Sequence, residues 1–159
     1  YKLYKDIQEL RKDIINQLLT ELKEALTIQN PIPLFEIPKE DMPENLILFF
    51  EHVQKNHIAY ETLLIYQTDA LLTNGIQEIL KGYVKDGIYI SETRPYLIDV
   101  NEQLIIAYVA GAYLESMRWW ITTNYAISPI DMAKTLIELS INGPYIKNDC
   151  LNWYNMTRE

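Results

Sequence analysis

Apolar residues recur every three or four positions along most of the chain, which is the spacing of one face of a helix. The first run starts at Ile7 and predicts a helix over residues 6–27. Asp6 stands where an N-cap is expected, and Glu9 lies three residues on, as in a capping box. The same spacing predicts further helices over residues 43–56, 56–72, 74–87, 101–124 and 128–143. The pattern therefore predicts an all-α fold.

The last of these helices has the clearest boundaries. Ser128 is expected to cap it, Pro129 occupies the first turn, and Asp131 completes a capping-box pattern. Gly143, followed by Pro144, should end it.

Three stretches break the helical pattern. Four prolines within residues 31–43 disfavour a helix, and the apolar residues among them predict an ordered loop instead. Residues 88–100 are expected to be irregular, and the tail over residues 144–159 is spaced for one short helix. No internal repeat interrupts this order, so the chain is expected to form one domain.

Composition limits the class of protein. The 159 residues are 48% hydrophobic and 23% charged, as in a globular protein that can bury a core. Neither a run long enough to span a membrane nor a signal-peptide pattern occurs, and the one cysteine, Cys150, suits a reducing compartment. We therefore expect a cytoplasmic protein without a membrane partner.

The net charge of −8 opposes binding to a phosphate backbone. Four basic residues near the start are a local exception, which is more often a solvated helix face than a binding site. These basic residues are Lys2, Lys5, Arg11 and Lys12.

Catalytic patterns are missing from the sequence. There is no phosphate-binding loop, no dinucleotide-binding glycine pattern and no nucleophile elbow. His52 and His57 lie five residues apart, which does not place them on one helical face as metal ligands. We therefore expect that the protein is not an enzyme and that it binds neither a cofactor nor a metal ion.

The helix predicted over residues 101–124 is apolar on more than one side, which favours burial against a second subunit. Small residues near Gly111 would let another helix approach closely. Arg118, Trp119 and Trp120 are residue types enriched at the centres of interfaces. Adjacent residues of a helix face different ways, so one of the two tryptophans is expected to be a core residue.

Two distant segments resemble the TetR family of transcriptional regulators. The start, "YKLYKDIQEL", is similar to the segment that closes the helix-turn-helix and opens the fourth helix, with Leu3 departing from the usual His. The stretch "YVAGAYLESMRWWITTNYAISPIDMAKTLIELSING" resembles the last two helices of the ligand-binding domain. It is most similar to the subgroup that includes the dihydroxyacetone-kinase regulator, and "FFEHVQKNHIAYETLL" resembles the turn between the fifth and sixth helices of that subgroup.

The resemblance implies a division of the chain and a dimer. Residues 1–5 would be the end of a helix-turn-helix domain that is otherwise absent, residues 6–143 the ligand-binding and dimerisation domain, and residues 144–159 a tail. The last two long helices would form a four-helix bundle across a two-fold axis. The residues expected at this homodimer interface are Ala107, Gly111, Arg118, Trp119, Met132 and Leu136.

The resemblance also implies an effector pocket and control of DNA binding. Aromatic residues that combine an apolar body with a polar tip are the candidates to line the pocket, although each could equally fill the core. These candidates are Phe50, His57, Tyr60, Tyr66 and Tyr83. The effector is expected to be small and largely apolar or neutral. Lys5 is a candidate for a contact with a DNA phosphate.

Two functions thus compete. The first is the effector-binding and dimerisation domain of a TetR-like regulator, a repressor that reaches its operator DNA through a missing helix-turn-helix. The alternative is a stand-alone helical interaction module that never had a DNA-binding part. An in-frame helix-turn-helix upstream of Tyr1 in the gene would favour the first.

Overall fold

A computed structural model describes residues 5–28, 36, 44–90 and 94–145, and over these ranges the protein is all-helical, as predicted. A short α-helix and a π-helix, labelled η2, follow one another at the corner after α2. The elements are α1 (Ile7–Ala25), α2 (Glu44–Lys55), α3 (His57–Tyr60), η2 (Glu61–Tyr66), α4 (Ala70–Tyr89), the 3₁₀ turn η3 (Arg94–Tyr96), α5 (Glu102–Thr122) and α6 (Pro129–Asn142).

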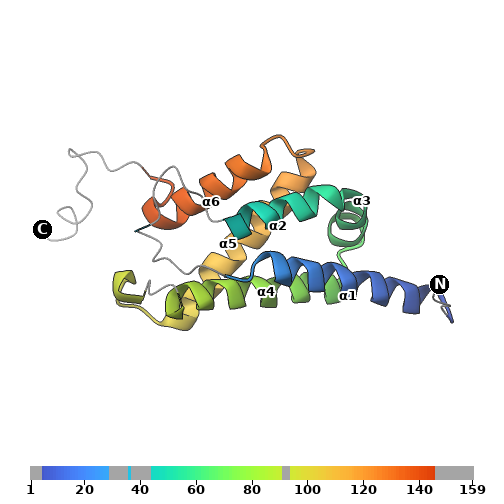
Figure 1. Cartoon of the computed structure of the whole chain (residues 1–159), viewed down its shortest axis with the longest axis horizontal. Coiled ribbons are helices and arrows are strands. Elements are labelled where there is room, and N and C mark those ends of the chain that lie inside the picture. Colours follow the sequence, from blue (N-terminus) through green and yellow to red (C-terminus); the bar gives the residue numbers. More distant parts are fainter. Residues whose placement is uncertain (1–4, 29–35, 37–43, 91–93, 146–159) are drawn as a thin grey trace, which may run out of the picture.

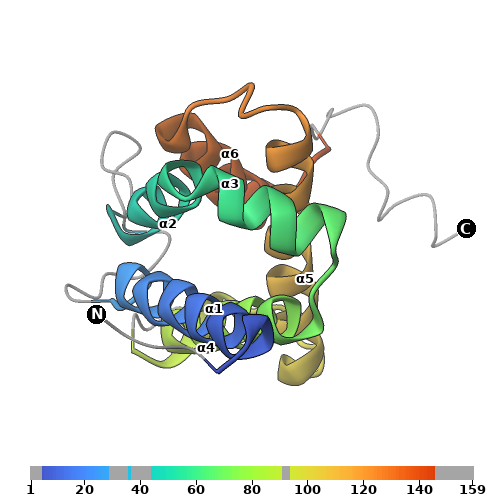
Figure 2. The same ribbon diagram turned by 90° about the vertical axis from the view of Figure 1, so that its right-hand side faces the viewer.

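The helices pack in two layers joined by α5. Helices α1 and α4 lie side by side in one layer, and α2 and α6 pack together in the other (Figure 1). Seen from the end, α5 runs from the α4 layer past η2 toward α6 (Figure 2). Because α1 also contacts α2, the first helix touches both layers.

The predicted helix caps are confirmed. The Asp6 carboxylate accepts a hydrogen bond from the Glu9 N–H at 2.8 Å, and the Ser128 hydroxyl accepts one from the Asp131 N–H at 3.2 Å. Gly143 ends α6 with a φ of 70°, a left-handed backbone that favours glycine. These three positions fix where the first and last helices begin or end.

The prediction of one helix over residues 56–72 is wrong. Thr68 has a φ of +46°, which breaks the helical backbone, and Asp69 then caps a new helix by accepting from the Leu72 N–H at 3.0 Å. Helix α4 therefore starts at Ala70 and continues through Gly87, where a break was expected. The apolar spacing runs on across the break, so periodicity alone does not detect it.

Only one of the two adjacent tryptophans is a core residue, as expected. Trp120 is fully buried, whereas Trp119 is 50% exposed. The Trp120 ring meets the Phe50 ring edge-on with the centroids 5.2 Å apart, and its indole N–H donates to the Ile127 carbonyl. Trp120 thereby packs α5 against α2 and orders the turn before α6.

Gly75 marks the closest approach of α1 and α4. A Cβ added at Gly75 would lie 2.7 Å from Leu19 Cδ2, which is closer than carbon atoms pack. The absence of a side chain at Gly75 thus lets the α1 side chain lie directly on the α4 backbone. No pattern in the sequence indicates this role of Gly75.

Some predictions concern residues outside the described ranges. The loop expected over residues 31–43 lies outside them apart from Glu36, and so do residues 1–4 and the tail from residue 146. Among the described residues, no helix is sufficiently long and apolar to cross a membrane.

Candidate functional site

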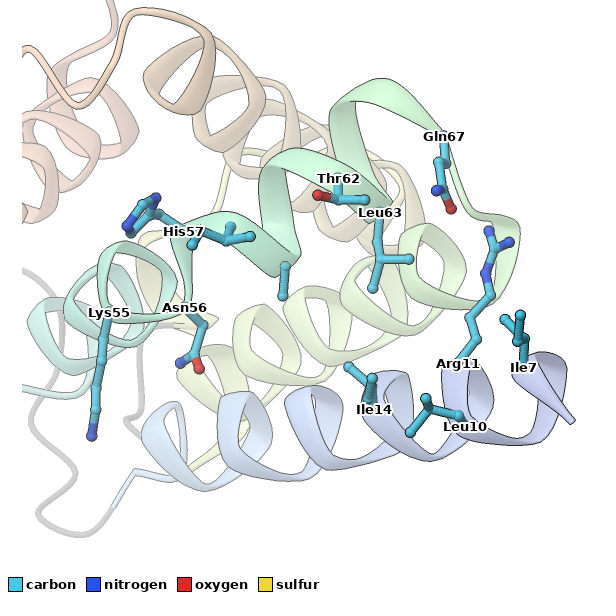
Figure 3. A pocket seen from close by; sticks show the side chains of 12 residues that line it. Ile7, Leu10, Arg11, Ile14, Lys55, Asn56, His57, Thr62, Leu63 and Gln67 are labelled. Atoms are coloured by element: carbon cyan, nitrogen blue, oxygen red, sulfur yellow. The ribbon is translucent and has the colours of Figure 1, made fainter. Parts of the chain in front are cut away.

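A groove of about 600 Å³ opens between the first half of α1 and the corner formed by α2, α3 and η2 (Figure 3). Half of the residues that line it are apolar: Ile7, Leu10, Ile14, Ile58, Ala59 and Leu63. The other half are polar or basic: Arg11, Lys55, Asn56, His57, Thr62 and Gln67.

The α1 wall of the groove follows from helical spacing. Ile7, Leu10 and Ile14 are three and four residues apart, so they lie on one face of α1. Further along the helix this face is covered by the core, but here Ile7 is 79% exposed. The groove is therefore an apolar surface that the described residues leave open to solvent.

Arg11 fixes this part of α1 to the start of α4. Its Nη2 atom lies 2.6 Å from the Asp69 carboxylate, whose side chain is only 12% exposed. The hydrogen bond from the Leu72 N–H and the interaction with Arg11 hold the pKa of Asp69 below its usual value, against the effect of burial. Asp69 thus both caps α4 and anchors a residue of the groove.

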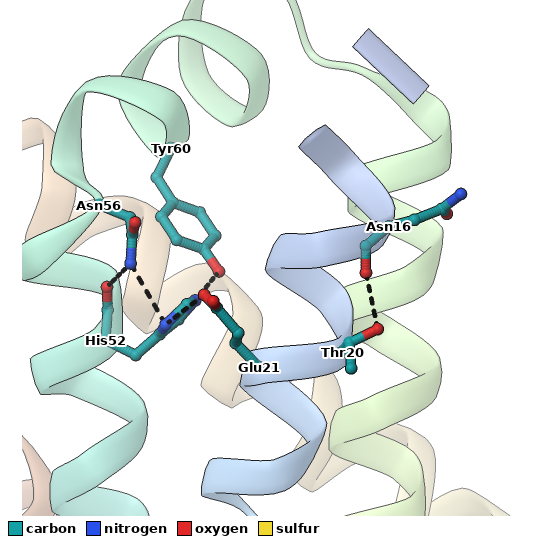
Figure 4. A network of polar contacts seen from close by, with 6 residues as sticks. All are labelled: Asn16, Thr20, Glu21, His52, Asn56 and Tyr60. Atoms are coloured by element: carbon teal, nitrogen blue, oxygen red, sulfur yellow. Dashed lines mark hydrogen bonds and ion pairs between the residues drawn. The ribbon is translucent and has the colours of Figure 1, made fainter. Parts of the chain in front are cut away.

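A partly buried polar network lies beside the groove and joins α1, α2 and α3 (Figure 4). His52 Nε2 and the Tyr60 hydroxyl are 2.8 Å apart, and the Asn56 amide donates to the His52 carbonyl at 2.9 Å. The Glu21 carboxylate lies 3.6 Å from His52 Nδ1. Burial lowers the pKa of His52 and raises that of Tyr60, so both groups are uncharged at neutral pH.

Glu61 connects the groove with the turn between α5 and α6. Its Oε1 atom lies 3.4 Å from His57 Nδ1 and accepts a hydrogen bond from the Tyr125 hydroxyl at 3.1 Å. Burial and the neighbouring Glu61 carboxylate raise the pKa of Tyr125, so the phenol stays protonated and donates. Asn124 and Tyr125 both have positive φ values, and the Glu61 contact holds this turn in place.

The π-helix lies in the wall opposite α1. Single turns of π-helix are rare and occur frequently at functional sites. Here η2 supplies Thr62 and Leu63 to the groove, and the Leu63 carbonyl accepts from the Asp69 N–H at 2.8 Å. The groove wall and the cap of α4 are thus built by one short segment.

The five predicted effector residues occupy different environments. His57 lines the groove. Phe50 and Tyr60 are fully buried in the core, Tyr83 is partly buried against it, and Tyr66 is 83% exposed outside the groove lining. The structure does not bring these residues together in one site, and whether any of them contacts an effector stays a prediction.

The residues predicted for the dimer interface divide between surface and core. Ala107 and Trp119 are exposed, and Gly111 is half-buried. Arg118 is also half-buried, with its guanidinium 3.3 Å from Glu115. On α6, by contrast, the two predicted residues, Met132 and Leu136, are buried in the core of the single chain.

Sequence reasoning missed the residues that shape the groove. Arg11 and Asp69 are 58 positions apart, and no local pattern pairs them. The available signal was the run of apolar residues in the first two turns of α1, which had been used only to predict the helix. Lys5 is exposed, and its role toward DNA stays a prediction. Within the described ranges no group of three His, Cys, Asp or Glu could hold a metal ion.

Comparison with known proteins gives one match. A family model described as the C-terminal region of transcriptional regulators, of the TetR type, matches residues 40–142. This range includes every described helix except α1. No curated protein and no solved structure matched the chain.

Proposed function

The chain belongs to the family of TetR-type transcriptional regulator C-terminal regions, and we propose that it is the effector-binding and dimerisation domain of such a regulator. In this proposal the groove beside α1 receives a small molecule, and α5 with α6 forms a homodimer in the cytoplasm. A helix-turn-helix outside these 159 residues would bind the operator, and the regulator would act as a repressor. The likeness to the dihydroxyacetone-kinase-regulator subgroup stays a prediction.

The exposed face of α5 supports the dimer and is the main observation behind it. Leu104, Tyr108 and Trp119 are large apolar residues that are at least half exposed in the single chain. They lie on the same side of α5 as Ala107 and Gly111, and a Cβ at Gly111 would meet no atom within 4 Å. An apolar helix face with a flat centre suits close approach of the same helix from a second copy.

Helix α6 also has exposed apolar residues. Ile130 and Leu139 are both more than 40% exposed, whereas Met132 and Leu136 point into the core. The buried Nε atom of Arg118 lies 3.3 Å from Glu115 Oε1 as an ion pair, but no described residue forms a well-aligned hydrogen bond with it. Ile130 and Leu139 are nine residues apart and therefore lie on opposite flanks of α6. We propose that α6 contributes one of these flanks to the dimer, and that a partner subunit supplies a second acceptor near Arg118.

The groove supports effector control through α1. It lies between α1 and the α2–η2 corner, so an occupant would contact both sides at once. An effector acts only when it binds two arrangements of the protein with different affinity. A change in the position of α1 would provide those two arrangements, because α1 touches both helical layers.

The dimer is tested by light scattering of residues 1–159 at micromolar concentration. We expect about twice the chain mass of 18.7 kDa. Gly111→Leu should give a monomer, because the new side chain would separate the two α5 helices. Gly82→Leu is the matched control, since Gly82 also faces open space but lies on α4. A monomeric wild-type protein, or a Gly111→Leu variant that remains dimeric, would contradict the proposal.

A further inference from the structure

We infer that the groove binds an amphipathic anion, meaning a molecule with an apolar body and one carboxylate head group. The inference rests on the proposed function, because it assigns a ligand class to the same groove. It replaces the earlier expectation of a neutral ligand.

The charge of the groove lining differs from that of the chain. The chain has 22 acidic and 14 basic side chains, yet none of the twelve lining residues is Asp or Glu. The lining instead contains Arg11 and Lys55. A groove with this lining favours a negative ligand, although the protein as a whole carries a net charge of −8.

The guanidinium of Arg11 can donate hydrogen bonds to a second acceptor. Its Nη2 atom contacts Asp69, which fixes the planar group, while the side chain remains 32% exposed. A guanidinium has five N–H donors, so a ligand carboxylate can use those that Asp69 does not. In Figure 3, Arg11 extends from α1 toward Gln67 at one end of the groove.

The carboxylates of Asp69 and Glu61, described beside the groove, already have partners that compete with a cationic ligand. Asp69 is engaged by Arg11 and by the Leu72 N–H, and Glu61 is engaged by His57 and by the Tyr125 hydroxyl. The apolar wall formed by Leu10, Ile14 and Leu63 suits the hydrocarbon part of either kind of ligand. The head group is therefore what distinguishes the classes, and the charge favours an anion.

Calorimetry with three ten-carbon probes tests the inference: decanoate, decan-1-ol and decyltrimethylammonium, each below its aggregation concentration. We expect decanoate to bind at least about tenfold more tightly than decanol, as a charge-assisted hydrogen bond implies. The ammonium probe should bind more weakly than decanol.

Two variants locate the effect. Arg11→Met should weaken decanoate binding about tenfold more than decanol binding, since decanol reports any loosening of α1 caused by loss of the Asp69 contact. Arg94→Met, the same change outside the groove, should alter neither. Lys55→Met provides a second test, because Lys55 forms no ion pair with a described residue and its loss should not affect folding. It should weaken decanoate binding about threefold.

Two results would overturn the inference, and they differ in meaning. Equal binding of decanoate and decanol, both weakened by Leu10→Gln at an exposed position of the lining, would show a working groove that does not select anions. Binding of none of the three probes would contradict the groove as a small-molecule site, and with it the effector part of the proposed function.

Discussion

Tyr60 and His52 satisfy each other's polar atoms in the protein interior. The Tyr60 hydroxyl lies 2.8 Å from His52 Nε2, and the two rings meet edge-on with their centroids 5.7 Å apart. Tyr60 is fully buried and follows α2 after a single turn of chain, so this pair fixes the angle of the corner that forms one wall of the groove.

Replacing Tyr60 by Phe should destabilise the fold by about 1–3 kcal/mol, because it leaves a buried ring nitrogen of His52 without its partner. Urea unfolding at one fixed protomer concentration measures the change. Tyr66→Phe removes the same hydroxyl from a residue that is exposed, and we expect a change within about 0.5 kcal/mol. Similar effects of the two substitutions would show that the Tyr60 hydrogen bond contributes nothing.

Stability should fall as the pH drops below about 6.5, the ordinary pKa of histidine. Burial lowers the pKa of His52 in the folded state, while Glu21 raises it in part and Lys55 lowers it further. The unfolded chain therefore binds the proton more tightly, and the His52 contribution is complete above pH 6.5 and decreases toward the folded-state pKa. Unfolding free energies at pH 7.5 and 5.5 test this.

His52→Gln is the control for that pH dependence. The variant should show a smaller loss of stability between pH 7.5 and 5.5, because it has no group at this position to protonate. Asp69, whose pKa is lowered from about 3.8, titrates below this interval and should not contribute. An unchanged pH dependence in the variant would assign the effect to other groups.

Gly75→Ala and Gly82→Ala should have opposite effects on the free energy of unfolding, although both residues lie inside α4. Alanine in an exposed helix interior is about 1 kcal/mol more favourable than glycine, and Gly82 has open space for the methyl group. At Gly75 the methyl group would displace Leu19, and such overpacking costs about 1–3 kcal/mol. Thermal and urea unfolding should therefore rank Gly82→Ala above Gly75→Ala. The double variant Leu19→Ala/Gly75→Ala should show less than the sum of the two single losses, and simple additivity would refute the contact.

Asp69→Ala should cost about 1 kcal/mol more than Asp69→Asn. Both variants lose the ion pair with Arg11, but asparagine can still accept from the Leu72 N–H and cap α4. Chemical denaturation of the two variants separates the cap from the ion pair. Equal losses would mean that the ion pair alone stabilises this junction.

Local signals in the sequence predicted the class of fold and several helix ends. The caps at Ser128 and Asp6 depend only on the three residues that follow each of them. The helix end at Gly143 depends only on the backbone conformation that glycine allows. The start of α4 was missed because Leu64 and Leu72 continue the helical spacing across Thr68. Asp69 was the residue that should have indicated a new N-cap.

The groove could not be predicted in the same way. Phe50, Tyr60 and Tyr83 have the composition of a pocket lining, but the same composition fills a core, and only three-dimensional packing separates the two. The Arg11–Asp69 contact depends on a turn of chain after η2 that brings α4 back under α1. Periodicity describes faces of single helices and does not specify which faces stay uncovered.

The double contact of Glu61 would link the two proposed equilibria, ligand binding and dimerisation. Glu61 touches His57 in the groove and Tyr125 in the turn between the helices proposed to dimerise. A ligand that changes the His57–Glu61 contact therefore changes the free energy of the α5–α6 turn, and coupling of this kind is reciprocal. Dimerisation would change the affinity for the ligand by some factor, and saturation of the groove would change the dissociation constant of the dimer by the same factor. The ligand concentration needed for half-saturation would therefore depend on how much of the protein the cell contains.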